Sequence, residues 1–172
     1  MSYTKAFGQV LSNKKIAADT FNLTVKTPQA SDAQIGQFMQ IYCEGKTLRR
    51  PISICEIDRE AETMRMVYLA KGDGTRWLSG VKPGDSLDLL GPIGHGFAVS
   101  PNKKILVVGG GIGVPPLLET AKACGGNADA ILGFKNANYA ILLDDFSKAC
   151  GDVSACTDDG SLGVRKYGQQ RR

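Results

Sequence analysis

The feature of this 172-residue sequence that most constrains its fold is a change in hydrophobic periodicity near residue 100. Before that point, short alternating or β-branched runs are separated by turn residues, which is typical of antiparallel strands. After it, strand-like and helix-like segments alternate, which is typical of a parallel sheet. The sequence therefore predicts one domain over residues 1–100, a second over residues 101–163 and an atypical basic tail over residues 164–172.

The first domain contains six strand-like runs, which suit a six-stranded antiparallel barrel. They cover residues 7–16, 20–28, 37–44, 51–58, 62–71 and 85–93. One short helix interrupts them in "GDGTRWLSG" and ends at Gly80. Asp73, Gly74 and Thr75 are the residues expected to cap its start.

The second domain alternates between strands and helices. Strands are expected over residues 105–111, 129–134 and 152–157, and helices over residues 114–126 and 138–151. The apolar run of the second helix could also form a strand. The order strand, helix, strand, helix, strand predicts a parallel, Rossmann-like sheet.

The formal net charge of +4 is concentrated at the end of the chain. The last nine residues, "VRKYGQQRR", contain four basic residues and no acidic ones, and the rest of the chain has 17 of each. Nucleic-acid binding needs clustered Lys and Arg on the folded surface, so this balance argues against a nucleic-acid partner.

No segment of the sequence is expected to cross a membrane. The longest apolar stretch, residues 105–118, is interrupted by four glycines and two prolines. The N-terminus, "MSYTKAFGQV", lacks the apolar core of a signal peptide. We therefore expect a cytoplasmic protein with no membrane partner.

The cysteines are odd in number, lack a Cys-x-x-Cys pair and lie among apolar or small residues. They are Cys43, Cys55, Cys124, Cys150 and Cys156. We interpret most of them as buried, reduced thiols. None has the spacing of iron–sulfur cluster ligands, so the sequence predicts no metal site.

A glycine-rich turn, "GGGIGVPP", joins the first strand of the second domain to its first helix. Bare N–H groups at such a turn attract a phosphate. The candidates for binding a nicotinamide nucleotide are Gly109, Gly110, Gly111 and Gly113. The pattern is G-x-G-x-x-P rather than G-x-G-x-x-G, and tight packing of strand against helix is the alternative interpretation.

The residue that would bind an adenosine ribose is not evident. Lys135 and Asn136 follow the next strand, where an acidic residue is expected, so the sequence does not distinguish NAD from NADP. Asp158 and Asp159 could orient a ribose, but Gly160 behind them favours a turn.

The tetrapeptide Arg-Pro-x-Ser at residues 50–53 combines three groups that suit an anionic ring ligand. Arg50 can pair with a phosphate, Pro51 fixes the strand start and Ser53 can donate a hydrogen bond to a ring. The alternative is an edge strand with solvated arginines. The helix start at residues 74–75 would be a second anion site, and two such sites suit a pyrophosphate.

Other candidate residues are assigned no site. His95, the single histidine, is interpreted as a solvated loop residue rather than an acid–base catalyst. Phe97 and Trp77 are interpreted as packing residues. We predict no catalytic side chain.

These motifs, with "LLGPIGHGF" and "VVGGGIGVPPLL" in order along the chain, resemble those of the ferredoxin reductase family. Within that family the similarity is to the electron-transfer subunits of dihydroorotate dehydrogenase B, and it extends from about residue 6 to "TDDGSLG" at residues 157–163. The resemblance implies a barrel that binds FAD and a parallel-sheet domain that binds NAD. The FAD contacts that it implies are Arg50, Pro51, Ile52, Ser53, Val67, Tyr68, Leu69, Gly74 and Thr75.

The resemblance also implies a partner and a pathway. Electrons would come from an FMN-containing dihydroorotate dehydrogenase catalytic subunit, in a hetero-tetramer, and pass through a [2Fe-2S] cluster and FAD to NAD in pyrimidine biosynthesis. Two alternatives remain: a small flavin subunit of a ferredoxin or sulfide:NAD(P) oxidoreductase, and a truncated FAD-binding fragment without activity.

The end of the chain departs from that family. The family continues with more of its nucleotide-binding sheet and a cysteine-rich segment that binds the cluster, so the parallel sheet is expected to be incomplete. The tail, residues 164–172, resembles truncated or out-of-frame coding rather than the start of a helix or strand. We therefore expect a second domain of marginal stability, with an exposed apolar strand edge.

Overall fold

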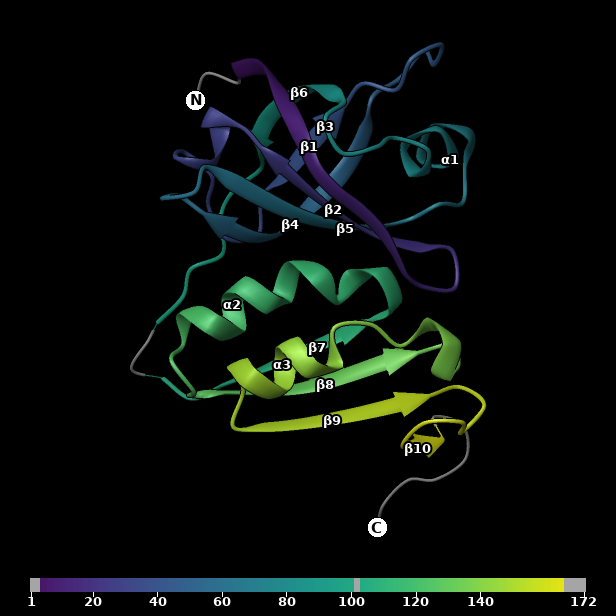
Figure 1. Ribbon diagram of the computed structural model, residues 1–172. Coiled ribbons are helices and arrows are strands. Elements are labelled where there is room, and N and C mark those ends of the chain that lie inside the picture. Colours follow the sequence, from purple (N-terminus) through teal and green to yellow (C-terminus); the bar gives the residue numbers. More distant parts are fainter. Residues whose placement is uncertain (1–3, 101–102, 166–172) are drawn as a thin grey trace. The chain divides into compact units, whose positions relative to one another are not determined.

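The computed structural model describes residues 4–100 and 103–165, and for residues 164 and 165 the backbone alone. Two compact units divide between Phe97 and Ala98, and each is described by itself. The first unit contains six strands and a helix, and the second contains a small sheet with two helices (Figure 1).

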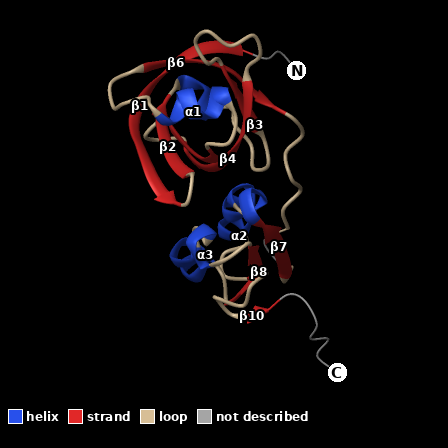
Figure 2. Ribbon diagram, turned by 90° about the vertical axis from the view of Figure 1, so that its right-hand side faces the viewer, coloured by secondary structure: helices blue, strands red, loops and turns tan. Residues whose placement is uncertain are grey.

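The first unit is a closed antiparallel barrel with the strand order β1-β2-β5-β4-β3-β6. Its strands are β1 (Thr4–Ala17), β2 (Thr20–Lys26), β3 (Phe38–Ile41), β4 (Arg50–Asp58), β5 (Thr63–Leu69) and β6 (Ser86–Ile93). Figure 2 shows them as a ring. The prediction of six strands in a barrel is confirmed, because the alternating patterns place one face of each strand inside.

Burial alternates along the strands, as the barrel requires. Leu23, Met39 and Leu89 are fully buried, and they come from three different strands. Buried Gln29 closes one end of the barrel: its Nε2 donates to the carbonyl oxygens of Thr4 (2.7 Å) and Gly91 (3.0 Å). The barrel therefore has a core of its own.

The helix of the first unit, α1 (Asp73–Ser79), follows β5. Its N-cap is Gly72, one residue before the expected caps, and Thr75 Oγ1 accepts hydrogen bonds from the N–H groups of Lys71 and Gly72, both at 3.1 Å. The threonine hydroxyl thus caps the start from the third helical position, and Gly80 ends the helix as predicted.

The second unit is a parallel sheet with the strand order β10-β9-β8-β7. Its elements are β7 (Ile105–Gly110), α2 (Leu118–Ala123), β8 (Ala128–Phe134), α3 (Leu143–Ala149), β9 (Asp152–Thr157) and β10 (Val164–Arg165). The predicted Rossmann-like order is confirmed. The register runs residue by residue from Ile105 opposite Ala128 to Gly110 opposite Gly133.

Both helices of the second unit are shorter than predicted. The first expected helix, residues 114–126, begins with a 3-10 turn at Pro115–Leu117, and another 3-10 turn at Gly111–Gly113 precedes it. The second begins only at Leu143, because Leu142 has a left-handed backbone with φ of 60°.

The expectation for the tail is wrong at its first two residues. Val164 and Arg165 form a short parallel strand against Cys156 and Thr157 of β9. Residues 166–172, the remainder of the tail, lie outside the described residues.

The two faces of the parallel sheet differ in their cover. Leu118 of α2 and Phe146 of α3 are fully buried, and both helices lie on one face (Figure 1). The other face carries Leu106, Val108 and Ile131, whose exposed fractions are 57%, 65% and 40%. Large apolar side chains are thus exposed on one face of the second unit.

All five cysteines are free thiols, as predicted. Cys43, Cys55 and Cys124 are buried, and Cys150 and Cys156 are half-buried. None of the helices found in the described ranges is long and apolar enough to cross a membrane.

Candidate functional site

The barrel has a gap in its hydrogen-bond ladder between β4 and β5. The two strands pair from Ile54 and Met66 toward their shared turn, and a bulge follows Ile54. Residues 50–53 pair instead with β3, and residues 67–69 pair with β2. Because a bulge bends its strand, β4 and β5 separate here and leave main-chain polar groups for a ligand.

Arg50 lies at this gap, against the first turn of α1. A Cβ added to buried Gly74 would lie 2.2 Å from Arg50 Nε, so glycine lets the arginine side chain lie across the helix start. Arg50 Nη1 donates to the carbonyl oxygens of Leu48 (2.5 Å) and Arg49 (3.4 Å). Within the described ranges no carboxylate forms an ion pair with Arg50, so its charge is available to an anion.

The residues after Arg50 alternate between the core and the outside of the barrel. Ile52 is 7% exposed and belongs to the core, so it can contact a ligand only through its main chain. Pro51 is exposed and Ser53 is half-buried. The side chains of Pro51 and Ser53 therefore lie on the face of β4 that is away from the core.

On the other side of the gap, residues 67–69 of β5 present main-chain atoms rather than side chains. Val67 and Tyr68 are buried, and Leu69 is half-buried. The ring of Tyr68 stacks on Phe21 inside the barrel, with 5.7 Å between centroids. The Tyr68 side chain is thus packed in the core, and a ligand at the gap would contact the Tyr68 backbone.

Burial dominates the electrostatics of two groups near the gap. Burial raises the pKa of the Cys43 thiol, and the positive charges of Arg50 and Lys46 oppose this shift. Burial also raises the pKa of Tyr68, against a hydrogen bond with Asn13. Both groups therefore stay protonated at neutral pH, and Arg50 provides the fixed charge.

The glycine-rich turn of the second unit has features of both interpretations of the sequence, which are phosphate binding and tight packing of strand against helix. A Cβ at Gly109 would lie 2.8 Å from Leu117 Cδ1, which is a packing requirement. Gly110, Gly111 and Gly113 have no atom within 4 Å of such a Cβ, and Gly111 has a φ of +50°. One glycine thus allows close packing, while the others leave open space beside the turn.

A pocket of about 440 Å³ adjoins this turn, at the carboxyl ends of three parallel strands. Three of the predicted glycines line it, but Gly113 does not. The full lining is Val108, Gly109, Gly110, Gly111, Ile131, Gly133, Phe134, Lys135, Cys156 and Asp158. Nucleotides bind at this edge in open α/β sheets.

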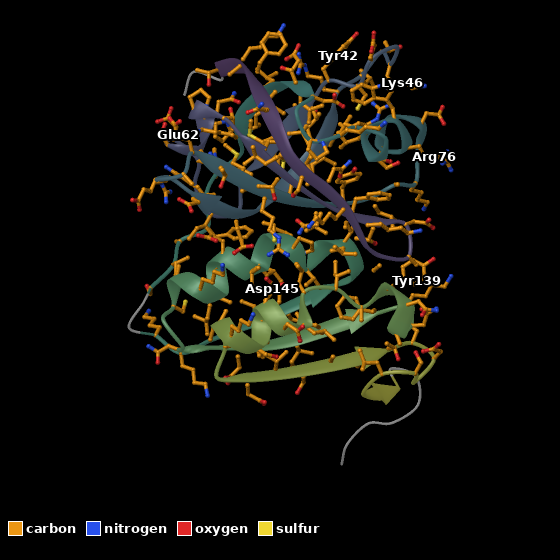
Figure 3. The ribbon with its side chains drawn as sticks, viewed as in Figure 1. Tyr42, Lys46, Glu62, Arg76, Tyr139 and Asp145 are labelled. Carbon is orange, nitrogen blue, oxygen red and sulfur yellow. The ribbon has the colours of Figure 1, made fainter. Side chains whose placement is uncertain are left out.

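Sequence reasoning missed the contribution of β9 to the pocket. Asp158, which the sequence analysis assigned to no site, follows β9 and is the acidic residue of the pocket lining. Lys135 follows β8 and also lines the pocket, and its Nζ lies 5.8 Å from the centroid of the Tyr139 ring. Figure 3 labels Tyr139. Asp158 could have been found by aligning the carboxyl ends of all three strands.

Asp159 supports the turn interpretation. Its Oδ1 accepts hydrogen bonds from Ser161 N (3.0 Å) and Ser161 Oγ (2.6 Å), and these bonds hold the pKa of the carboxyl below its usual value. His95 is exposed in a loop, and Phe97 is half exposed. In the described part of the chain, no three His, Cys, Asp or Glu side chains gather in a group that could hold a metal ion.

Comparison with known proteins identifies the class of the barrel. Residues 8–97 match the family described as the oxidoreductase FAD-binding domain. The match covers more than half of the chain, and the chain belongs to this family. Its prediction as an FAD-binding barrel is confirmed.

Curated relatives narrow the resemblance to one kind of subunit. The dihydroorotate dehydrogenase B (NAD(+)) electron transfer subunit of Streptococcus thermophilus is 44% identical over 166 residues, which cover 92% of this chain and 64% of the relative. The subunit of the same name from Bacillus pumilus is 38% identical, over 95% of this chain and 67% of the relative. The chain spans about two thirds of the length of these relatives.

Solved structures support the same fold. A structure of an NADH-dependent reduced ferredoxin-NADP oxidoreductase has a TM-score of 0.83 and 31% identity, and the match covers 93% of this chain and 59% of that one. An Amycolatopsis cytochrome P450 reductase has a TM-score of 0.77 at 20% identity, over 90% of this chain and 52% of the other. The ferredoxin reductase-like fold predicted from the motifs is therefore confirmed.

The residues at the gap fit FAD. The ligand carries a pyrophosphate, which Arg50 can pair with, and a polar ring edge, which free main-chain groups of residues 50–53 and 67–69 can hydrogen-bond. Gly74 keeps the helix start open for this arginine. Thr75 Oγ1 already forms hydrogen bonds with the backbone of Lys71 and Gly72, so a contact with FAD would be additional to these bonds.

Proposed function

We propose that this chain is the FAD-binding electron-transfer subunit of a dihydroorotate dehydrogenase B. Electrons pass from an FMN-containing catalytic subunit by way of FAD to NAD, in pyrimidine biosynthesis. The observation that carries the proposal is the gap between β4 and β5 with Arg50 beside it, in a chain 44% identical to a subunit of this kind. The hetero-tetramer and a cytoplasmic location are parts of the same proposal.

The predicted FAD contacts have different roles in this proposal, and some residues share a role. Arg50 pairs with the pyrophosphate, Ser53 donates a hydrogen bond to the ring, and Pro51 fixes the strand start. Ile52, Val67, Tyr68 and Leu69 contribute main-chain atoms, and Gly74 and Thr75 form the helix start. FAD supplies the redox chemistry when bound, so no general acid or base is needed from the chain.

The pocket beside the glycine turn is proposed as the site of the nicotinamide nucleotide. Gly109, Gly110 and Gly111 line it, and Asp158 gives it an acidic group. An acidic group favours a ribose hydroxyl over a 2′-phosphate, so NAD is the proposed acceptor. The names of the relatives support this choice, because they include NAD(+). Gly113 remains a candidate at the turn, outside the pocket lining.

The first test is the cofactor content of the purified chain. We expect flavin absorption bands, and FAD rather than FMN in the fraction released by denaturation. Arg50→Met, which keeps the length of the arm and removes the charge, is expected to weaken FAD binding at least tenfold. A colourless wild-type protein that takes up no added FAD would contradict the proposed flavin site.

The second test separates NAD from NADP. Under anaerobic conditions, NADH is expected to bleach the flavin bands faster than NADPH at the same concentration. Asp158→Ser is expected to reduce this preference, because it removes the charge that opposes a 2′-phosphate. Equal rates with both nucleotides in the wild type would contradict the role given to Asp158.

The third test concerns the partner. The chain is coexpressed with an FMN-binding catalytic subunit that oxidises dihydroorotate, and the complex is isolated by a tag on that subunit. We expect copurification and dihydroorotate-dependent reduction of NAD. Copurification without NAD reduction would instead favour an inactive FAD-binding fragment.

A second candidate function has support from one observation. The ferredoxin-NADP oxidoreductase structure is 31% identical and has a TM-score of 0.83, which favours a small flavin subunit of a ferredoxin or sulfide:NAD(P) oxidoreductase. The two candidates differ in their electron donor. Flavin reduction by reduced ferredoxin, but not through a dihydroorotate-oxidising partner, would select the second.

A further inference from the structure

The side chain of Asn13 connects the two segments that border the proposed flavin site. Its Nδ2 donates to the carbonyl oxygens of Leu78 (3.0 Å) and Val81 (3.2 Å), at the end of α1. Its Oδ1 accepts a hydrogen bond of 3.1 Å from the hydroxyl of Tyr68 in β5. One half-buried amide on β1 thus joins α1 to β5.

The chemistry of the three partners requires an amide at this position. Two carbonyl oxygens can only accept, and they need a donor on one side of residue 13. The Tyr68 hydroxyl is protonated, because burial raises its pKa, and it needs an acceptor on the other side. Asparagine presents both, whereas aspartate would place an acceptor against the two carbonyl oxygens.

The two segments joined by Asn13 are those that hold FAD in the proposed function. Tyr68 is the middle residue of the β5 segment at the gap, and its ring is fixed by stacking on Phe21. The other end of α1 carries Gly74, which has no room for a Cβ beside Arg50. A small shift of α1 would therefore move the helix start relative to Arg50 and to the β5 backbone.

We propose that Asn13 is a positioning residue for FAD, because it fixes α1 against β5 and so sets the distance between the two sides of the flavin site. This inference rests on the proposed flavin site. It adds a residue from β1, about 40 positions before the first predicted contact, that would act on the site through α1 and the Tyr68 side chain rather than by binding FAD itself.

The competing explanation is that Asn13 only stabilises the barrel. Gln29 provides a matched control, because its amide is buried and also donates to two carbonyl oxygens, those of Thr4 and Gly91. It lies at the far end of the barrel, since neighbouring Thr27 N donates to the Glu62 carbonyl oxygen. Figure 3 shows Glu62 at the end of the barrel opposite to Arg76 of α1.

The experiment measures the FAD dissociation constant and the unfolding midpoint of the full chain for Asn13→Leu and Gln29→Met. Each variant replaces an amide by an apolar side chain of similar size. We expect Asn13→Leu to weaken FAD binding about tenfold and to shift the flavin absorption bands, whereas Gln29→Met keeps the constant within about twofold despite a lower unfolding midpoint.

Tyr68→Phe keeps the test valid if Asn13→Leu does not fold. This variant removes one hydroxyl from the same network, and we expect it to weaken FAD binding about threefold to fivefold. Equal FAD affinity in wild type, Asn13→Leu and Tyr68→Phe would overturn the inference. So would a loss of affinity in Gln29→Met as large as that in Asn13→Leu.

The outcomes separate this inference from the function on which it rests. If the wild-type chain binds FAD and the Asn13→Leu and Tyr68→Phe variants bind it equally well, only the positioning role is overturned. A wild-type chain that binds no FAD overturns the flavin site itself, and the role of Asn13 with it.

Discussion

The barrel and the parallel sheet bury their apolar residues in different ways. In the barrel, the strands close on themselves, and Leu23, Met39 and Leu89 are fully enclosed. In the parallel sheet, helices cover one face, and Leu106 and Val108 are more than half exposed on the other. The comparison indicates that the first unit can be stable alone, whereas the second has apolar surface that favours further contacts.

Limited proteolysis gives the largest expected contrast between the two units. The second unit exposes one face of its sheet, so it should open more often than the barrel. We expect residues 98–172 to be cleaved at least about tenfold faster than residues 4–97, as followed by mass spectrometry of the fragments. Equal resistance of both units to the protease would contradict the lower stability expected for the second unit.

Substitutions of two neighbouring residues of β8 compare how much each face of the sheet contributes to stability. Leu132 is fully buried and faces the helices, whereas Ile131 is 40% exposed on the open face. Leu132→Ala should lower the free energy of unfolding of this unit by about 3 kcal/mol, and Ile131→Thr by less than about 0.5 kcal/mol. Chemical denaturation of the FAD-free chain would measure both, and similar losses would show that the open face is covered in solution.

An ion-pair network on the barrel predicts a pH dependence. Asp88 accepts from Arg49 at 2.8 Å and lies 3.1 Å from Lys5 Nζ. Burial raises its pKa, but the hydrogen bonds and charges of Arg49 and Lys5 outweigh burial, and the net pKa is lowered. Its stabilising effect is therefore present above the unfolded-state pKa of about 3.9 and is lost as pH falls through the lower folded-state value.

We expect Asp88→Asn to reduce the free energy of unfolding by about 2 kcal/mol at pH 7 and to flatten its decline below about pH 4. Asp73→Asn is the matched control, because Asp73 and Arg76 form an exposed pair with side-chain exposures of 75% and 64%. That control should change stability by less than about 0.5 kcal/mol. An unchanged pH profile in Asp88→Asn would contradict the role of this network.

The glycine turn gives the smallest expected effect on stability. Gly109→Ala should cost about 1 kcal/mol, because the new Cβ would meet Leu117 and Val114. Gly110→Ala has open space and should leave stability unchanged, while it obstructs the proposed nucleotide pocket and weakens NADH binding. Titration with NADH, followed by flavin bleaching, measures the difference. Equal NADH affinity in wild type and Gly110→Ala would favour packing alone.

The sequence predicted most elements of the fold because their signals are local. The six barrel strands follow from alternation within each run, and β7, β8 and β9 follow from apolar runs bounded by turns. The helix lengths were less predictable. Both helices begin later than predicted, because a 3-10 turn occupies Pro115–Leu117 and Leu142 has a left-handed backbone.

The candidate site was predictable only in part, for a related reason. Arg50, Ser53 and Gly74 lie in recognisable motifs, but the gap between β4 and β5 depends on strand register, which no single segment specifies. Asn13 has no motif, because its three partners are 55 to 68 positions away. Asp158 has the sequence context of a turn residue, and its place in the pocket lining depends on the alignment of three strand ends.

In the proposed flavin site, the gap between β4 and β5 would also make the flavin a part of the barrel wall. Where the strands separate, the cofactor would occupy the place of the missing ladder, so binding and folding are coupled at this position. FAD at one hundred times its dissociation constant would add about 2.7 kcal/mol to the free energy of unfolding. The heat resistance of this protein would then rise and fall with the flavin supply of the cell.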